Sequence, residues 1–148
     1  MMYWEDFEPG SSLDCGSKTV TKEEIIAFAK EFDPQPFHID EAVAKQSHFG
    51  GIIASGWHTS SICMRLAVDG VLSKTASMGS PGVDKLRWLK PLRPGMTVHA
   101  KVCVVDKTPS QSRNDRGRMT VRFELYDQDD ELLMDMTAMV LMGRRPNG

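Results

Sequence analysis

Residues 55–72 form a segment of helical length whose apolar side chains would point in most directions around the helix axis. Its apolar residues are Trp57, Ile62, Cys63, Met64, Leu66, Ala67, Val68, Val71 and Leu72. They do not form a single stripe. A helix that is apolar on most sides is enclosed by other elements rather than laid on a surface. We therefore predict a long central helix around which the rest of the chain folds.

The second half of the chain supplies strands that can enclose this helix. The predicted strands are residues 83–89, 97–105, 119–125 and 132–141, separated by turn residues. Apolar and polar residues alternate over residues 120–126, which is typical of a half-buried antiparallel strand with one wet face. With an early strand at 13–20, this pattern predicts an α+β fold in which an antiparallel sheet wraps a long helix.

Size and charge exclude several classes of protein. The 148 residues suit one domain. The 18 basic and 20 acidic residues give a net charge of −2, so the chain has no overall positive charge to attract nucleic acid or an anionic membrane. No 18-residue apolar run predicts a spanning helix. Glu5, Asp6 and Glu8 lie where a signal peptide would be basic and then apolar, so we expect a cytoplasmic protein.

A carboxylate and an imidazole flank two prolines at residues 33–38, which read Asp-Pro-Gln-Pro-Phe-His. The segment follows a helix that Thr21 and Glu24 open as a capping box and that Pro34 ends. Two prolines predict a stiff, non-helical arm. Such an arm suits acid–base catalysis by Asp33 and His38, because an imidazole exchanges protons near neutral pH. Alternatively, Asp33 merely ends the helix and His38 is an ordinary loop residue.

The start of the central helix is a second candidate site. Ser55 or Gly56 begins it, and the first N–H groups of a helix have no partner within the helix. Because Gly56 has no Cβ, a substrate oxygen that gains negative charge could approach its backbone N–H. We predict that Ser55 and Trp57, on either side, contact the substrate. Alternatively, Ser55 is only an N-cap and Gly56 only permits tight packing.

The histidines do not predict a metal site. His38, His48 and His58 are ten residues apart, which matches no pair of ligands on one helix, and His99 is distant. No Cys or carboxylate stands three or four residues from them in a ligand-like setting. We expect no metal.

Three segments together resemble the MaoC-like dehydratases, which include the R-specific enoyl-CoA hydratases. The hydratase motif of that family, Asp-x-Asn-Pro-x-His, resembles residues 33–38, with Gln35 in place of the Asn. Residues 49–59 and 86–95 are similar to the family's run into its central helix and to its strand with a Pro-Gly turn. The resemblance implies a hot-dog fold as one domain over residues 1–148, assembled as a homodimer or a higher homo-oligomer.

The resemblance also implies an activity, that of a hydro-lyase in fatty acid metabolism acting reversibly on a 2-enoyl or 3-hydroxyacyl thioester. Asp33 and His38 would hold water and exchange protons, and the Gly56 N–H would bind the thioester oxygen. The substrate would be carried on coenzyme A or an acyl carrier protein, and no separate cofactor is expected.

Two other functions are compatible with the same fold. The first is a thioesterase. Thioesterases of the hot-dog fold resemble one another in having a carboxylate on or beside the central helix, but residues 55–68 of this chain contain no Asp or Glu, which favours hydration over hydrolysis. A non-catalytic module that binds acyl thioesters is compatible with the ten methionines of the chain.

Overall fold

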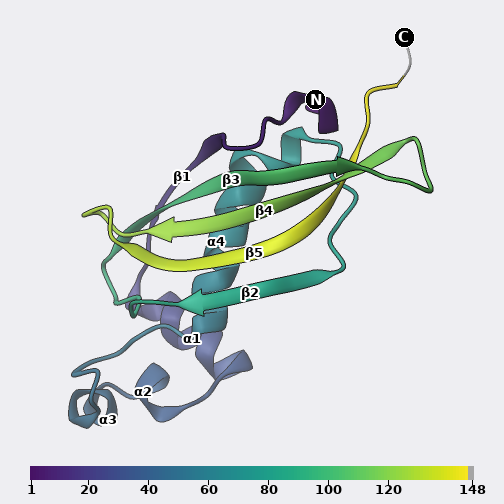
Figure 1. The fold of residues 1–148 in the computed structure, drawn as a ribbon. Coiled ribbons are helices and arrows are strands. Elements are labelled where there is room, and N and C mark those ends of the chain that lie inside the picture. The colour runs from purple at the N-terminus through teal and green to yellow at the C-terminus, as the bar shows by residue number, and fades with distance from the viewer. Residues whose placement is uncertain (147–148) are drawn as a thin grey trace.

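One antiparallel sheet curves around helix α4, Gly56–Gly70, in the computed structural model, which describes residues 1–146 (Figure 1). The strands are β1 (Ser12–Thr19), β2 (Gly82–Trp88), β3 (Thr97–Pro109), β4 (Arg116–Tyr126) and β5 (Leu132–Gly143). Their order in the sheet is β1-β3-β4-β5-β2, and every neighbouring pair is antiparallel. The predicted α+β fold, a sheet wrapped around a long helix, is confirmed.

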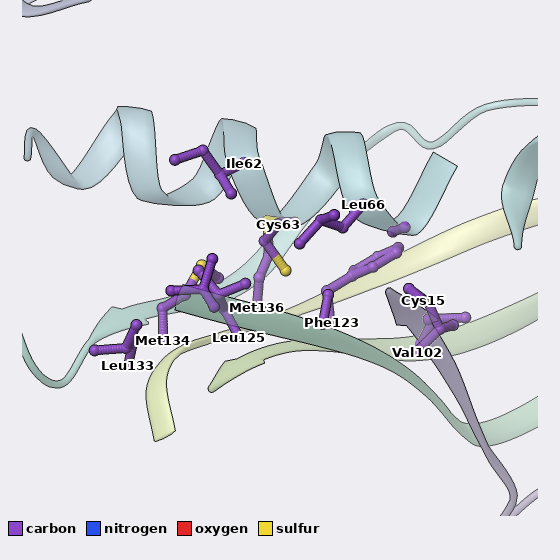
Figure 2. Packing of buried hydrophobic residues seen from close by; sticks show 14 of the residues in the cluster. Cys15, Ile62, Cys63, Leu66, Val102, Phe123, Leu125, Leu133, Met134 and Met136 are labelled. Carbon is purple, nitrogen blue, oxygen red and sulfur yellow. The ribbon is translucent and has the colours of Figure 1, made fainter. Parts of the chain in front are cut away.

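The core lies between α4 and the concave face of the sheet. Strand β4 alternates strictly, so that Val121, Phe123 and Leu125 are buried. Figure 2 shows Cys63 and Leu66 of α4 directed towards the sheet that carries Phe123. The alternation in the sequence therefore fixes which strand face meets the helix.

The enclosure of α4 is less complete than its sequence predicts. Trp57 is 59% exposed and Val68 is 37% exposed, so one side of the helix is open to solvent. A single sheet covers only the opposite side, where Gly70 packs so closely that a Cβ would lie 2.6 Å from the Cα of Cys15. No helix within residues 1–146 is long and apolar enough to cross a membrane.

Short helices fill the first half of the chain. They are η1 (Trp4–Asp6), α1 (Lys22–Phe32), α2 (Pro36–Ile39), α3 (Glu41–Gln46) and, after α4, η2 (Leu72–Lys74). The predicted capping box opens α1. The Glu24 N–H donates to Thr21 Oγ1 at 3.2 Å, and the Thr21 N–H donates to Glu24 Oε1 at 3.0 Å. The box fixes where α1 begins, and α1 leads directly to Asp33.

The predicted non-helical arm is partly wrong, because α2 forms one helical turn that includes His38. Pro36 is the first residue of this turn, where the missing N–H needs no partner within the helix and the fixed φ suits helical geometry. Only Asp33 to Gln35 stay outside helices, with Gln35 extended at φ −70° and ψ 140°. The prolines therefore restart a helix instead of preventing one.

Candidate active site

The carboxylate of Asp33 and the imidazole of His38 lie together, as the sequence predicts. Asp33 ends α1, and its N–H donates to the Ala29 carbonyl at 2.8 Å. His38 follows one α2 turn later, and its Nε2 lies 3.4 Å from Asp33 Oδ2. His38 is 4% exposed, whereas the Asp33 side chain is 19% exposed. The pair thus combines a fixed imidazole with a carboxylate that a ligand can reach.

The backbone of residue 53 determines the tautomer of His38. Its Nδ1 lies 2.6 Å from the Ile53 carbonyl oxygen. A carbonyl can only accept a hydrogen bond, so Nδ1 must carry the proton and donate. In the neutral ring, Nε2 is then an acceptor that faces Asp33. Because the two facing atoms are 3.4 Å apart and both accept, they suit a small donor such as water placed against both.

Two polar side chains hold the Asp33 carboxylate. Ser55 Oγ donates to Oδ2 at 2.7 Å, and Gln35 Nε2 donates to Oδ1 at 2.7 Å. Burial acts to raise the pKa of Asp33, but these hydrogen bonds outweigh it together with the attraction of a protonated His38, whose Nε2 would then donate, so the pKa of this carboxyl lies below its usual value. Asp33 is therefore ionised at neutral pH. Gln35, the departure from the family motif, is long enough to reach this carboxylate.

The N-terminus of α4 faces the same site. Ser55 is the N-cap residue, but its hydroxyl is donated to Asp33 and makes no cap hydrogen bond. Within residues 1–146, the N–H groups of Gly56 and Trp57 have no acceptor. Unpaired N–H groups at a helix N-terminus attract negative charge. The predicted oxyanion position therefore has two N–H groups without a hydrogen-bond partner among residues 1–146.

A cavity of about 410 Å³ joins these groups. Asp33, His38 and Gly56 line it together with Trp57 and Trp88. Ser55 does not line the cavity and is completely buried, so the structure places it behind Asp33. The predicted site residues Asp33, His38, Gly56 and Trp57 therefore share one cavity, and Ser55 supports it from behind.

Trp88 is a cavity residue that the sequence did not single out. It ends β2, and its ring packs directly on Gly56, where a Cβ would lie 2.5 Å from Trp88 Cδ2. The two residues are far apart in the sequence and belong to different elements, β2 and α4, so their contact forms only in the folded chain. The adjacent Lys90 also lines the cavity, but its Nζ is paired with Asp127 and Glu131.

The other histidines lie outside this site. His58 is buried and stacks on Phe28, and His99 lies 3.2 Å from Asp130. Within residues 1–146, no three His, Cys, Asp or Glu side chains are grouped so that they could hold a metal ion.

The arrangement of one antiparallel sheet around α4 is the hot-dog fold. A double-hotdog protein of Mycobacterium tuberculosis superposes with a TM-score of 0.81 at 16% sequence identity, over 99% of this chain and 46% of that one. The crystal structure of the MaoC-like dehydratase from Rhodospirillum rubrum superposes with a TM-score of 0.91 at 41% identity, over 99% of this chain and 100% of that one.

The sequence profile of the MaoC like domain matches residues 6–125, so the chain belongs to this family. Among curated relatives, YdeM of Bacillus subtilis is 32% identical over 97% of this chain and 100% of its own length. The 3-hydroxybutyryl-CoA dehydratase of Methylorubrum extorquens is 26% identical over 98% of this chain and 87% of its own length. Both the Rhodospirillum rubrum protein and the Methylorubrum relative are named as dehydratases.

Proposed function

We propose that this protein is a hydro-lyase that adds water to a 2-enoyl thioester, or removes it from a 3-hydroxyacyl thioester. The observation that carries the proposal is the placement of Asp33, His38 and the unpaired Gly56 N–H around one cavity. Water is the co-substrate, and the Asp33–His38 pair presents two acceptors to it. The named activity of the Methylorubrum relative supports the same chemistry.

Two sets of groups act in this reaction, the Asp33–His38 pair and the N–H groups at the start of α4. Asp33 and His38 hold a water whose oxygen bonds to the β-carbon while the pair takes up its proton. A proton from the pair is delivered to the α-carbon. As the double bond is lost, the thioester oxygen gains enolate charge, which the N–H groups of Gly56 and Trp57 stabilise. Together the two steps add one water molecule across the double bond, so no oxidant or reductant is needed.

The acyl group is carried on coenzyme A or an acyl carrier protein, and the cavity takes up the thioester end. Hydrolysis of the thioester is a weaker candidate, because the first three turns of α4 contain no Asp or Glu, and Asp69 near its end is paired with Arg65.

We also propose that the chain assembles as a homodimer through β2. This edge strand is exposed along almost its whole length, and Val83 is 50% exposed. An edge strand presents unpaired backbone N–H and C=O groups, which can pair with the same strand of a second chain.

Hydration of a four-carbon 2-enoyl-CoA tests the activity, with loss of the conjugated thioester absorbance as the signal. We expect Asp33→Asn and His38→Ala each to lower kcat by about a hundredfold or more, because the first removes a carboxylate that can take up a proton and the second removes the imidazole. The thermal unfolding transition checks that both variants fold. His99→Ala, at a histidine outside the cavity whose Nε2 lies 3.2 Å from Asp130, is the matched control and should keep full turnover. Turnover retained in both site variants would overturn the proposal.

A further inference from the structure

His58 is a buried histidine that the proposed reaction does not use. It is 7% exposed and lies in the first turn of α4, where its N–H donates to the Ser55 carbonyl at 3.0 Å. Its ring stacks on the ring of Phe28 of α1, with centroids 4.6 Å apart and planes 7° from parallel. Offset stacking is one of the two arrangements that aromatic rings prefer. The stack therefore joins the first turn of α4 to α1.

The surroundings of His58 keep its ring uncharged. Burial lowers the pKa of His58 below its usual value, while Glu24 of α1 opposes this effect and Lys18 of β1 adds to it. Lys18 and Glu24 are paired at 2.8 Å, and further along α4 Arg65 and Asp69 are also paired. The buried Nδ1 of His58 has no hydrogen-bond partner within residues 1–146. The feature of His58 that contacts α1 is therefore a flat, neutral ring.

A second contact joins the same two helices close by. The hydroxyl of Ser55, at the start of α4, donates to Asp33, which ends α1. On α1, Phe28 precedes Asp33 by five residues, roughly 7.5 Å along the helix. A single hydrogen bond would let the two helix ends rotate about it. The stack, about one turn away, removes this freedom and fixes the angle between the helices.

We propose that the stack of His58 on Phe28 is a positioning contact that holds the Asp33 carboxylate in its catalytic place. By fixing the end of α1 against the first turn of α4, it keeps Asp33 beside His38 and in the same cavity as Gly56. A misplacement of about 1 Å can lower a rate by up to about a hundredfold. His58 itself does not line the catalytic cavity. The inference rests on the proposed function and adds two positioning residues to it.

Turnover of a four-carbon 2-enoyl-CoA at neutral pH tests this role. We expect His58→Ala and Phe28→Ala each to lower kcat by about tenfold with little change in KM, because Asp33 is displaced while the substrate contacts remain. The double variant should lose no more than either single variant, since both substitutions remove one shared contact. His58→Phe keeps a flat ring at this position and should restore most of the lost kcat.

Leu66→Ala is the matched control, because Leu66 is another buried residue of α4 but is directed towards the sheet (Figure 2). It should lower the thermal unfolding temperature and leave kcat unchanged. An equal loss of kcat in Leu66→Ala would overturn the inference, since reduced stability alone would then explain the loss. Failure of His58→Phe to restore kcat, or losses that multiply in the double variant, would overturn it as well.

A spectroscopic measurement separates this inference from the proposed reaction. The ring Hε1 resonance of His38 reports on the adjacent Asp33 carboxylate, and its loss in His38→Ala assigns it. At neutral pH and without substrate, it should shift in His58→Ala and Phe28→Ala and return towards its wild-type position in His58→Phe. A wild type that hydrates no enoyl-CoA would refute the proposed function, whereas an unmoved His38 resonance would refute the positioning role. If His58→Ala does not fold, Phe28→Ala, at a half-buried residue, decides in the same way.

Discussion

Ser55 shows how one side chain can serve the site in a way that its position in the sequence conceals. A serine that begins a helix normally accepts a hydrogen bond from the first turn. Here its hydroxyl is fully buried and donates to Asp33 instead. One side chain therefore stabilises the ionised carboxylate and accepts no hydrogen bond from the first turn of α4, where the N–H groups of Gly56 and Trp57 have no acceptor within residues 1–146.

Ser55→Ala should move the acidic limb of the kcat/KM profile to higher pH, because Asp33 loses a donor that lowers its pKa. The folded-state pKa of Asp33 lies below its unfolded value. Its contribution to stability is therefore present above the unfolded pKa and is lost as pH falls through the folded pKa. We expect the variant to lose about 1–3 kcal/mol of unfolding free energy at pH 7, measured by urea denaturation.

Ser61→Ala is the matched control, because Ser61 is an exposed serine on the same helix whose hydroxyl donates to the Trp57 carbonyl. It should shift neither the pH profile nor the stability by a comparable amount. An acidic limb that stays in place in Ser55→Ala would show that Asp33 does not set it.

At the scale of elements, a capping box begins α1, the helix that ends at Asp33. Thr21→Ala removes one of its two reciprocal hydrogen bonds and should cost about 1 kcal/mol of unfolding free energy. Glu23→Gln changes an exposed residue of the same turn that makes no cap contact and serves as the control. Equal urea midpoints for the two variants would contradict the role of the box.

Short sequence patterns predicted the elements that are determined by neighbouring residues. The alternation of β4 and the capping box of α1 depend on residues a few positions apart, and both are confirmed. The turn of α2 was missed because two prolines can either exclude a helix or begin one, and the choice depends on where His38 is buried. The Asp33–His38 pair was predicted, whereas the Trp88–Gly56 contact was not, because it joins β2 to α4 and no local pattern predicts how these two elements pack.

At the scale of the whole molecule, β2 leaves one edge of the sheet unpaired within residues 1–146. We expect sedimentation to give a mass twice the 16.5 kDa of one chain. Val83→Lys places like charges against each other across a symmetric edge contact and should shift the equilibrium towards monomer. Val105→Lys alters an equally exposed valine on an interior strand and should keep the dimer. A wild type that sediments as a monomer would contradict the proposed assembly.

The groups proposed to act on the substrate, from the Asp33 carboxylate to the N–H of Trp57, come from residues 33–57, a single short stretch of the chain. The hairpin between β3 and β4 lies at the opposite end of the molecule from α2 and α3 (Figure 1). The site residues and this hairpin are therefore separate parts of the molecule. A peptide tag or an added loop inserted into that distant hairpin should therefore leave the activity unchanged.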